Sequence, residues 1–206
     1  MRIVVIVEGK TERAFRPHVH RFLGERPELN NRMPQLVFVP CKGRLPKEQL
    51  LKRDVERHLN DRDRPADAVI ALTDVYTGTQ PPEFKSAADA KAMMKGWVGR
   101  NERFHPHAAQ HDFEAWLVPY WQRIQQISGS NRAAPGNPEG INHREPPSKL
   151  LKDVFRTGTR GKLYDKELHG SAILKDQDLT IAARSCPELK AFLNTILQLS
   201  GGDPIA

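Results

Sequence analysis

The amino-acid sequence predicts an α/β fold with a central, mostly parallel sheet of about four strands, flanked by helices and followed by a C-terminal helical extension. Two observations lead to this prediction. Short apolar runs rich in β-branched residues alternate with segments of helical periodicity, and the connections between them are short, as in βαβ units. The chain has 206 residues, of which 38% are hydrophobic. That length suits one domain of roughly 100–200 residues.

Four segments are predicted to be strands. Residues 3–7, 36–39 and 68–72 are continuous apolar runs, which is the pattern of parallel strands buried on both faces. Residues 105–110 form a fourth, weaker candidate. Pro40 ends the second strand because proline cannot donate a hydrogen bond to a neighbouring strand.

Five segments show the spacing of a helix with one apolar face. They are residues 11–23, 47–59, 113–121, 148–155 and 187–199. Residues 128–147 are instead rich in Gly, Pro, Asn and Ser, which is typical of a surface loop. The predicted organisation is therefore an α/β domain at residues 1–127, a loop at 128–147, and a helical extension at 148–206 packed on the same domain.

Composition excludes several classes of protein. The two cysteines, Cys41 and Cys186, are too few and too far apart for a disulfide framework. No apolar run approaches the roughly 20 residues that span a bilayer, and the first apolar run is too short for a signal peptide. We therefore expect a cytoplasmic protein without a membrane partner. The net charge of +7 favours polyanionic partners, chiefly nucleic acid.

Carboxylates follow two of the predicted buried strands. Glu8 comes directly after the first strand and precedes Gly9, while Asp74 ends the third strand. Glu12 falls in the first turn of the following helix, close enough to share a cation with Glu8. Ligands of open α/β sheets bind at the carboxyl ends of strands, and sites with only oxygen ligands favour Mg²⁺ or Mn²⁺. A nucleotide-binding Walker loop is excluded, because Val4 stands where its first glycine is required.

These motifs resemble the Toprim domain of topoisomerases, primases and overcoming-lysogenization-defect nucleases. There, a strand-end Glu-Gly and a later Asp-x-Asp hold Mg²⁺ for phosphodiester chemistry. The chain is more similar still to a bacterial Toprim-like family of unassigned function, encoded in places beside ATPase genes of defence loci. The matching motifs are residues 7–12, residues 74–76, His111-Asp112-Phe113-Glu114-Ala115, residues 147–149, Tyr164-Asp165-Lys166 and His169-Gly170. The resemblance covers most of the chain and implies a Toprim-like, Rossmann-like fold.

One position departs from the nuclease pattern. Tyr76 stands where an active Toprim nuclease has its second aspartate, and a phenol is a poor ligand for a hard cation at neutral pH. Another carboxylate is therefore needed, and Asp112 and Glu114 are candidates because both follow the fourth strand. Glu114 lies off the apolar stripe of its helix, so we expect that its side chain need not be buried in the core. The predicted metal ligands are Glu8, Glu12, Asp74 and Glu114.

The resemblance also implies roles in catalysis. Mg²⁺ polarises a scissile phosphate and lowers the pKa of an attacking water. Glu8 is a metal ligand or a general acid and base, Lys10 offsets charge developing on the phosphate, and His111 is a proton carrier or a second ligand. A zinc site formed by His105, His107 and His111 is a weak alternative, because a fourth ligand is missing.

Basic residues near these carboxylates predict a surface that contacts a phosphate backbone. The residues expected to bind nucleic acid are Arg13, Lys42, Arg44, Lys149 and Lys152. Arg16, Arg21, Arg156, Arg160 and Lys162 extend the same set. No base-reading motif accompanies them, so the sequence indicates no sequence specificity.

The sequence thus predicts a Mg²⁺- or Mn²⁺-dependent phosphodiester hydrolase that acts on nucleic acid as the effector partner of an ATPase in bacterial defence. The main alternative is a non-catalytic Toprim-like module that binds a partner protein or nucleic acid. A hydrolase of small phosphate esters uses the same metal chemistry and is a third alternative. An acidic ligand within reach of Glu8 and Asp74 favours the enzyme over the binding module.

Overall fold

The computed structural model describes residues 1–76, 82–140, 145–161 and 163–206, and all of their side chains except that of Lys10. The strands are β1 (Arg2–Val7), β2 (Gln35–Pro40), β3 (Ala68–Asp74) and β4 (Phe104–Ala109). The helices are α1 (Lys10–Gly24), α2 (Glu48–Leu59), α3 (Ala87–Val98), α4 (Trp121–Ser128), α5 (Pro147–Thr157), α6 (Lys166–Leu174), α7 (Leu179–Ser185) and α8 (Pro187–Leu199). Among the described helices, none combines the length and apolar character that crossing a membrane requires.

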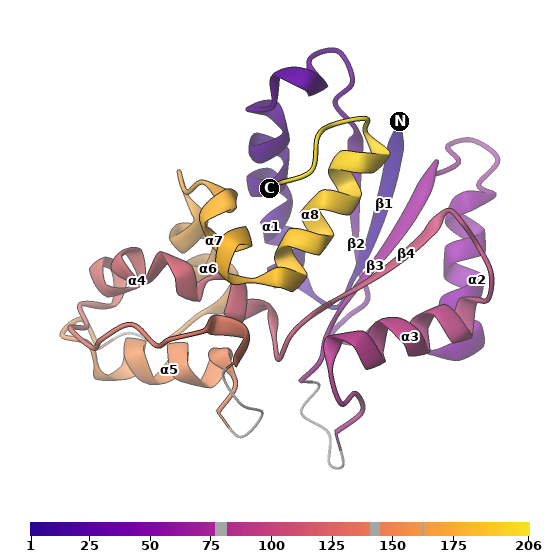
Figure 1. The fold of residues 1–206 in the computed structure, drawn as a ribbon. Helices are drawn as coiled ribbons and strands as arrows, with labels where there is room; N and C mark the ends of the chain where they lie inside the picture. Colours follow the sequence, from indigo (N-terminus) through magenta and orange to yellow (C-terminus); the bar gives the residue numbers. More distant parts are fainter. Residues whose placement is uncertain (77–81, 141–144, 162) are drawn as a thin grey trace.

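The four strands form one parallel sheet in the order β2-β1-β3-β4. β1 is central, and its Val5 lies between Phe38 of β2 and Ile70 of β3. Figure 1 shows helices on both faces of this sheet, with all four strands running the same way. The predicted α/β fold class is confirmed. Parallel strands also end together, so the residues that follow β1 and β3 meet at one edge of the sheet.

Alternate residues of the strands serve two separate apolar layers. Ile3, Val5 and Val7 of β1 pack on the face covered by α1 and α8. Val4 and Ile6 point to the opposite face, which is covered by α2 and α3 (Figure 1). Phe192 of α8 lies at the centre of the first layer, where its ring centroid is 5.9 Å from that of Trp116 and 6.4 Å from that of Phe15. Helix α8 therefore completes a core that begins with the first strand and helix.

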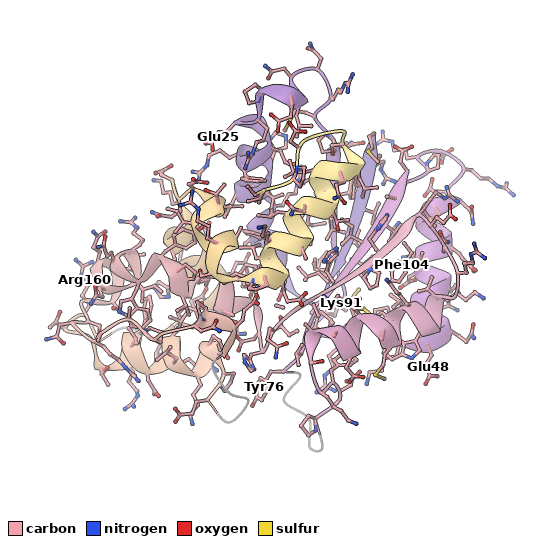
Figure 2. All side chains as sticks on the ribbon, in the orientation of Figure 1. Glu25, Glu48, Tyr76, Lys91, Phe104 and Arg160 are labelled. Carbon is pink, nitrogen blue, oxygen red and sulfur yellow. The ribbon has the colours of Figure 1, made fainter. Side chains whose placement is uncertain are left out.

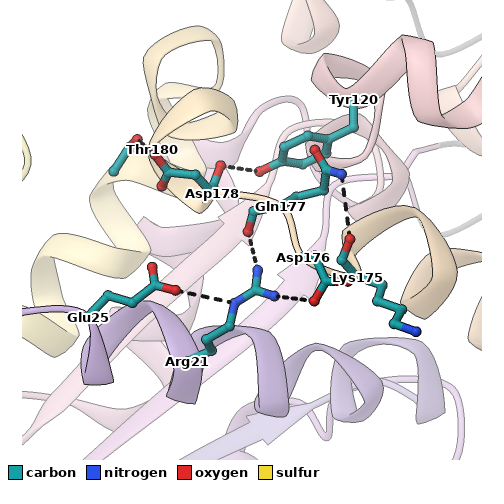
Figure 3. A network of polar contacts seen from close by, with 8 residues as sticks. All are labelled: Arg21, Glu25, Tyr120, Lys175, Asp176, Gln177, Asp178 and Thr180. Carbon is teal, nitrogen blue, oxygen red and sulfur yellow. Dashed lines mark hydrogen bonds and ion pairs between the residues drawn. The ribbon is translucent and has the colours of Figure 1, made fainter.

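The later helices join the same apolar layer as β1 and α1. A polar network ties α1 to the segment between α6 and α7 (Figure 3). Arg21 of α1 lies 3.3 Å from the Asp176 carboxylate, contacts the Glu25 carboxylate at 3.7 Å, and donates to the carbonyl oxygen of Gln177. The Tyr120 hydroxyl donates to the carbonyl oxygen of Asp178 at 2.9 Å. These contacts hold α6 beside α1, which matters for the site below.

Residues 113–121 do not form the single α-helix that was predicted, so this prediction is wrong. Two short 3-10 helices, Phe113–Trp116 and Val118–Tyr120, occupy this segment, and α4 begins only at Trp121. Pro119 explains the difference, because it has no N–H to donate to the carbonyl of Ala115 four residues earlier. That carbonyl faces the thiol of Cys186 instead, at 3.7 Å.

Four helices were not predicted from the sequence, namely α3, α4, α6 and α7. The segment predicted as a loop, residues 128–147, contains a short 3-10 helix at Pro138–Gly140, and residues 141–144 lie outside the described residues. The other predicted helices are found within two residues of their expected ends.

Candidate metal centre

Glu8 joins the carboxyl ends of β1 and β3. Its Oε1 accepts hydrogen bonds from the Asp74 N–H at 3.1 Å and from the Thr73 hydroxyl. Burial raises the pKa of the Glu8 carboxyl to about 7, and the negative charges of Glu12 and Glu83 add to this rise. The prediction that strand-end carboxylates of neighbouring strands come together is therefore met by Glu8 and Asp74.

Asp74 lies among four other carboxyl groups. Burial raises its pKa well above the usual value, and the charges of Glu12, Glu8, Asp112 and Glu114 raise it further. We call these five residues, Glu8, Glu12, Asp74, Asp112 and Glu114, the carboxylate cluster. Mutual repulsion on this scale favours either protonation or a bound cation.

Glu12 is fixed by the turn between β1 and α1. It is buried, and its Oε2 accepts a hydrogen bond from the Gly9 N–H at 2.9 Å, which caps the start of α1. A Cβ at position 9 would lie 3.3 Å from this same oxygen, so glycine gives the carboxylate room. Burial and the charge of Glu114 raise the pKa of Glu12.

Asp112 and Glu114 belong to the segment that follows β4, and they complete the carboxylate cluster. Asp112 is 2% exposed; its Oδ2 accepts from the Ser148 N–H at the start of α5, at 3.1 Å, while its Oδ1 is buried without a hydrogen-bond partner. Burial and the charge of Glu114 raise the pKa of Asp112 to about 7. Glu114 is 0% exposed, but it is buried beside Lys166 and the other carboxyl groups and not in the apolar core. All four residues of its 3-10 helix are buried, which the α-helical spacing did not anticipate.

Lys166 supplies a positive charge to the cluster, and sequence reasoning gave it no role. Its Nζ lies 3.0 Å from Oε1 and 3.2 Å from Oε2 of Glu114. Burial lowers its pKa, but the charges of Glu114, Asp74 and Asp112 outweigh burial, and the pKa is raised above its usual value. Asp165 caps α6 by accepting from the Leu168 N–H at 2.6 Å, which places Lys166 at the first position of the helix.

The remaining predicted catalytic residues are less closely tied to the cluster. The side chain of Lys10 lies outside the described residues. His111 is buried with a backbone φ of 70°, and its carbonyl accepts from the Tyr76 N–H at 2.5 Å. Tyr76 thus lies at the carboxyl edge of the sheet, as Figure 2 shows. Nε2 of His107 contacts the Thr195 hydroxyl at 3.0 Å, which accounts for this histidine as part of the packing of α8.

The basic residues are divided among three surfaces. Arg13 lines an open groove of about 730 Å³ along α1, together with Arg16, His20 and Glu167. Lys42 and Arg44 line a second pocket beside β2. On α5, Lys149 lies 3.8 Å from Glu145, and Lys152 is exposed. Lys162 lies outside the described residues.

The sequence of the chain shows the family to which it belongs. A family described as a domain of unknown function, DUF4276, matches residues 7–197. The chain belongs to the DUF4276 family. No curated protein matches it in sequence. Among solved structures, the C-terminal region of the Burkholderia pseudomallei OLD protein has a similar fold, with a TM-score of 0.52 and 13% identity over 97% of this chain and 98% of that chain.

The donor set of this DUF4276 cluster fits a hard divalent cation, because every group is a carboxylate oxygen and one of them, Asp112 Oδ1, is buried and unpartnered. Within the described parts of the chain, however, no three carboxylate, imidazole or thiol groups are arranged to hold one ion. The local contacts give the reason: Glu12 bonds to Gly9, Glu8 bonds to Asp74, and Glu114 is paired with Lys166. Binding a cation therefore requires some of these carboxylates to leave their present partners and turn toward one another.

The cluster predicts an unusual dependence of stability on pH in metal-free protein. The pKa values of Glu8 and Asp112 are about 7 when folded and about 4 in an unfolded chain. The folded state therefore binds more protons, so stability contributed by the protonated carboxyls is complete below about pH 4 and is lost as the pH rises through 7. We expect a loss on the order of 2 kcal/mol.

Urea denaturation in EDTA at about pH 5 and about pH 7.5 measures this loss. Millimolar Mg²⁺ should recover part of the stability at the higher pH, because a cation that binds only the folded state stabilises it. A metal-free protein that is equally stable at both pH values would show that Glu8 and Asp112 do not have raised pKa values in the folded state.

Proposed function

We propose that this DUF4276 protein is a Mg²⁺- or Mn²⁺-dependent phosphodiester hydrolase of the Toprim type that acts on nucleic acid. The observation that carries the proposal is the carboxylate cluster at the carboxyl edge of a parallel sheet, with its buried, unpartnered Asp112 oxygen. Tyr76 takes the place of one Toprim aspartate, but Glu12, Asp112 and Glu114 bring further carboxylates to the same edge. The OLD-like fold and the resemblance to Toprim nucleases support the same reading.

The residues have distinct roles under this proposal. Glu8, Glu12, Asp74 and Glu114 would hold the cation, and Asp112 adds an oxygen from the far side. A cation held there supplies Lewis-acid polarisation of the phosphate. The alternative role of Glu8 is that of the base: where it does not hold the cation, its pKa of about 7 suits a group that takes a proton from water at neutral pH. The ammonium of Lys166 is placed to offset negative charge on a phosphate beside Glu114.

Nucleic acid is the proposed substrate because cationic surfaces adjoin the cluster. Arg13 directly follows Glu12, and Glu167 of the same groove directly follows Lys166, so the α1 groove begins beside the site. Lys149 lies in the first turn of α5, whose Ser148 N–H contacts Asp112. Action in the cytoplasm, with an ATPase partner in bacterial defence, belongs to the same proposal through the family resemblance.

Titration of Mg²⁺ and Mn²⁺ into wild type and Glu8→Gln, followed by calorimetry with nucleic-acid cleavage assayed alongside, tests the proposal. We expect binding and cleavage in the wild type, and loss of both in the variant, because the amide cannot supply a charged oxygen. Glu56→Gln on the exposed side of α2 is the matched control and should behave as wild type. Metal binding without cleavage would favour the non-catalytic binding module, and cleavage that survives Glu8→Gln would exclude the site.

A further inference from the structure

A second pocket lies beside the carboxylate cluster, at the edge of the sheet. It is an open pocket with a volume of about 340 Å³, lined by the end of β2, the loop that follows, and α2. This volume is within the range of roughly 300–1,000 Å³ that small-molecule sites occupy. The proposed hydrolase mechanism uses none of the interior of this pocket. The chemistry of the lining residues indicates what the pocket can bind.

The floor of the pocket is apolar and its rim is cationic. Ile6 is buried and Val39 and Pro40 are half-buried, so these apolar residues form the floor beneath the exposed cations. Lys42, Arg44 and Arg57 contribute positive charge at the rim, and Asp54 is the carboxylate that lines it. Asp54 is paired with Arg57 at 3.4 Å, and the three cations outnumber the one carboxylate of the lining. An apolar surface next to clustered cations suits a ligand with a flat, weakly polar part and an anionic part.

One polar atom inside the pocket region lacks a partner. Nε2 of His58, a residue that lines the pocket, is buried without a hydrogen bond. Burial and the charge of Arg57 lower the pKa of this histidine, so its ring is neutral at pH 7. A neutral imidazole can donate to or accept from a ligand, whichever the ligand offers.

The pocket is connected to Glu8 through the loop after β2. The Gly43 N–H donates to the Glu8 carbonyl at 2.7 Å, and Arg44 lines both this pocket and a small cavity that Glu8 and Thr73 also line. The charge of Glu8 is close enough to contribute to the raised pKa of the Cys41 thiol at the pocket wall. An anionic group held by Arg44 therefore lies next to the carboxylate cluster.

We infer that the β2–α2 pocket binds one nucleotide unit of the substrate, with its base on the Ile6–Val39 floor and its phosphate on Lys42, Arg44 and Arg57. The inference rests on the proposed function, because it names part of that reaction's substrate. The floor offers no aromatic ring and no rigid donor pattern for one base, so binding is indifferent to the base. The pocket positions the nucleotide, and the neighbouring phosphodiester then lies beside Glu8.

Binding of 5′-AMP in EDTA tests the inference without any metal or cleavage. Isothermal calorimetry or ligand-observed NMR should show binding to wild type, and adenosine should bind at least about tenfold more weakly, because it lacks the phosphate. Arg57→Ala and Lys42→Ala should each weaken AMP binding by about tenfold. Arg53→Ala is the matched control, since Arg53 is an exposed cation of the same helix outside the pocket.

The outcomes separate this inference from the proposed function. Asp74→Asn should bind AMP as wild type does in EDTA, because Asp74 lies outside the pocket. Wild type that binds AMP but no Mg²⁺ or Mn²⁺ would overturn the hydrolase and leave the pocket standing. No AMP binding at millimolar concentration, equal weakening by Arg53→Ala and Arg57→Ala, or equal affinity for adenosine and AMP would each overturn the pocket. Circular dichroism of each variant shows whether a loss of AMP binding reflects unfolding. Inorganic phosphate should compete with AMP, because it occupies only the cationic rim.

Discussion

Replacing Lys166 with methionine is expected to destabilise the protein by about 3 kcal/mol and to abolish cleavage. The Lys166 ammonium lies 3.0 Å from a Glu114 oxygen, and Glu114 is 0% exposed. Removing one partner of a buried ion pair costs roughly 3–5 kcal/mol, because the other charge is left without compensation. The lower end applies here, since the Lys166 side chain is 43% exposed and water screens part of the pair.

Chemical denaturation of Lys166→Met in EDTA measures the effect, and a second substitution identifies its origin. Adding Glu114→Gln removes the stranded charge and should return more than half of the lost stability. Lys149→Met is the control, because its contact with Glu145 is exposed and longer, at 3.8 Å; its cost should stay below about 1 kcal/mol. An equal loss of unfolding free energy in Lys149→Met and Lys166→Met would mean that the buried Lys166–Glu114 pair stabilises the protein no more than an exposed ion pair does.

Asp74→Asn is expected to reduce metal-dependent cleavage by a factor of 10³ or more, on the order of 4 kcal/mol in the barrier, while making the metal-free protein more stable. Asp74 is the residue on which the charges of the four other cluster carboxyls converge. The amide keeps the shape of the side chain and removes its charge. Repulsion is relieved, so stability in EDTA at about pH 8 should rise by about 1 kcal/mol or more.

Opposite signs for activity and stability are the mark of a functional site here, because a merely structural aspartate would lose both. Thermal denaturation in EDTA and in millimolar Mg²⁺ measures the stability, and Mg²⁺ should stabilise wild type but not Asp74→Asn. Asp153→Asn, on the exposed side of α5, should change neither quantity. A variant that is destabilised in EDTA would falsify the assignment of Asp74 to a repulsive cluster.

Much of this fold was predictable because it depends on local patterns. Strand β1 is a continuous β-branched run and β3 is a continuous apolar run, and a buried parallel strand has few alternatives to such a composition. Helix α8 was predicted at its observed bounds because its apolar residues keep a regular spacing. Helix α3 was missed because half of its residues are Ala or Met, with little contrast between its faces. Helices α6 and α7 were missed because each is short, so few residues report a period.

The site was only half predictable for a related reason. Glu8 and Asp74 could be placed because a strand end locates a side chain at the sheet edge. Lys166 could not, since its position depends on α6 packing beside α1, through contacts such as Arg21 with Asp176. That contact joins residues far apart in the chain, and no sequence window contains both. The burial of Glu114 was missed for the same reason.

The central position of β1 also determines the order in which the chain can assemble. β1 pairs with β2 and β3, never with a hairpin partner, so its hydrogen bonds form only after a helix has crossed over the sheet each time. Phe192 of α8 then closes the layer over Phe15 and Trp116. Such non-local pairing slows folding. During synthesis, β1 and α1 therefore expose apolar surface until α8 emerges, so a ribosome that stalls before α8 holds a chain prone to capture by chaperones.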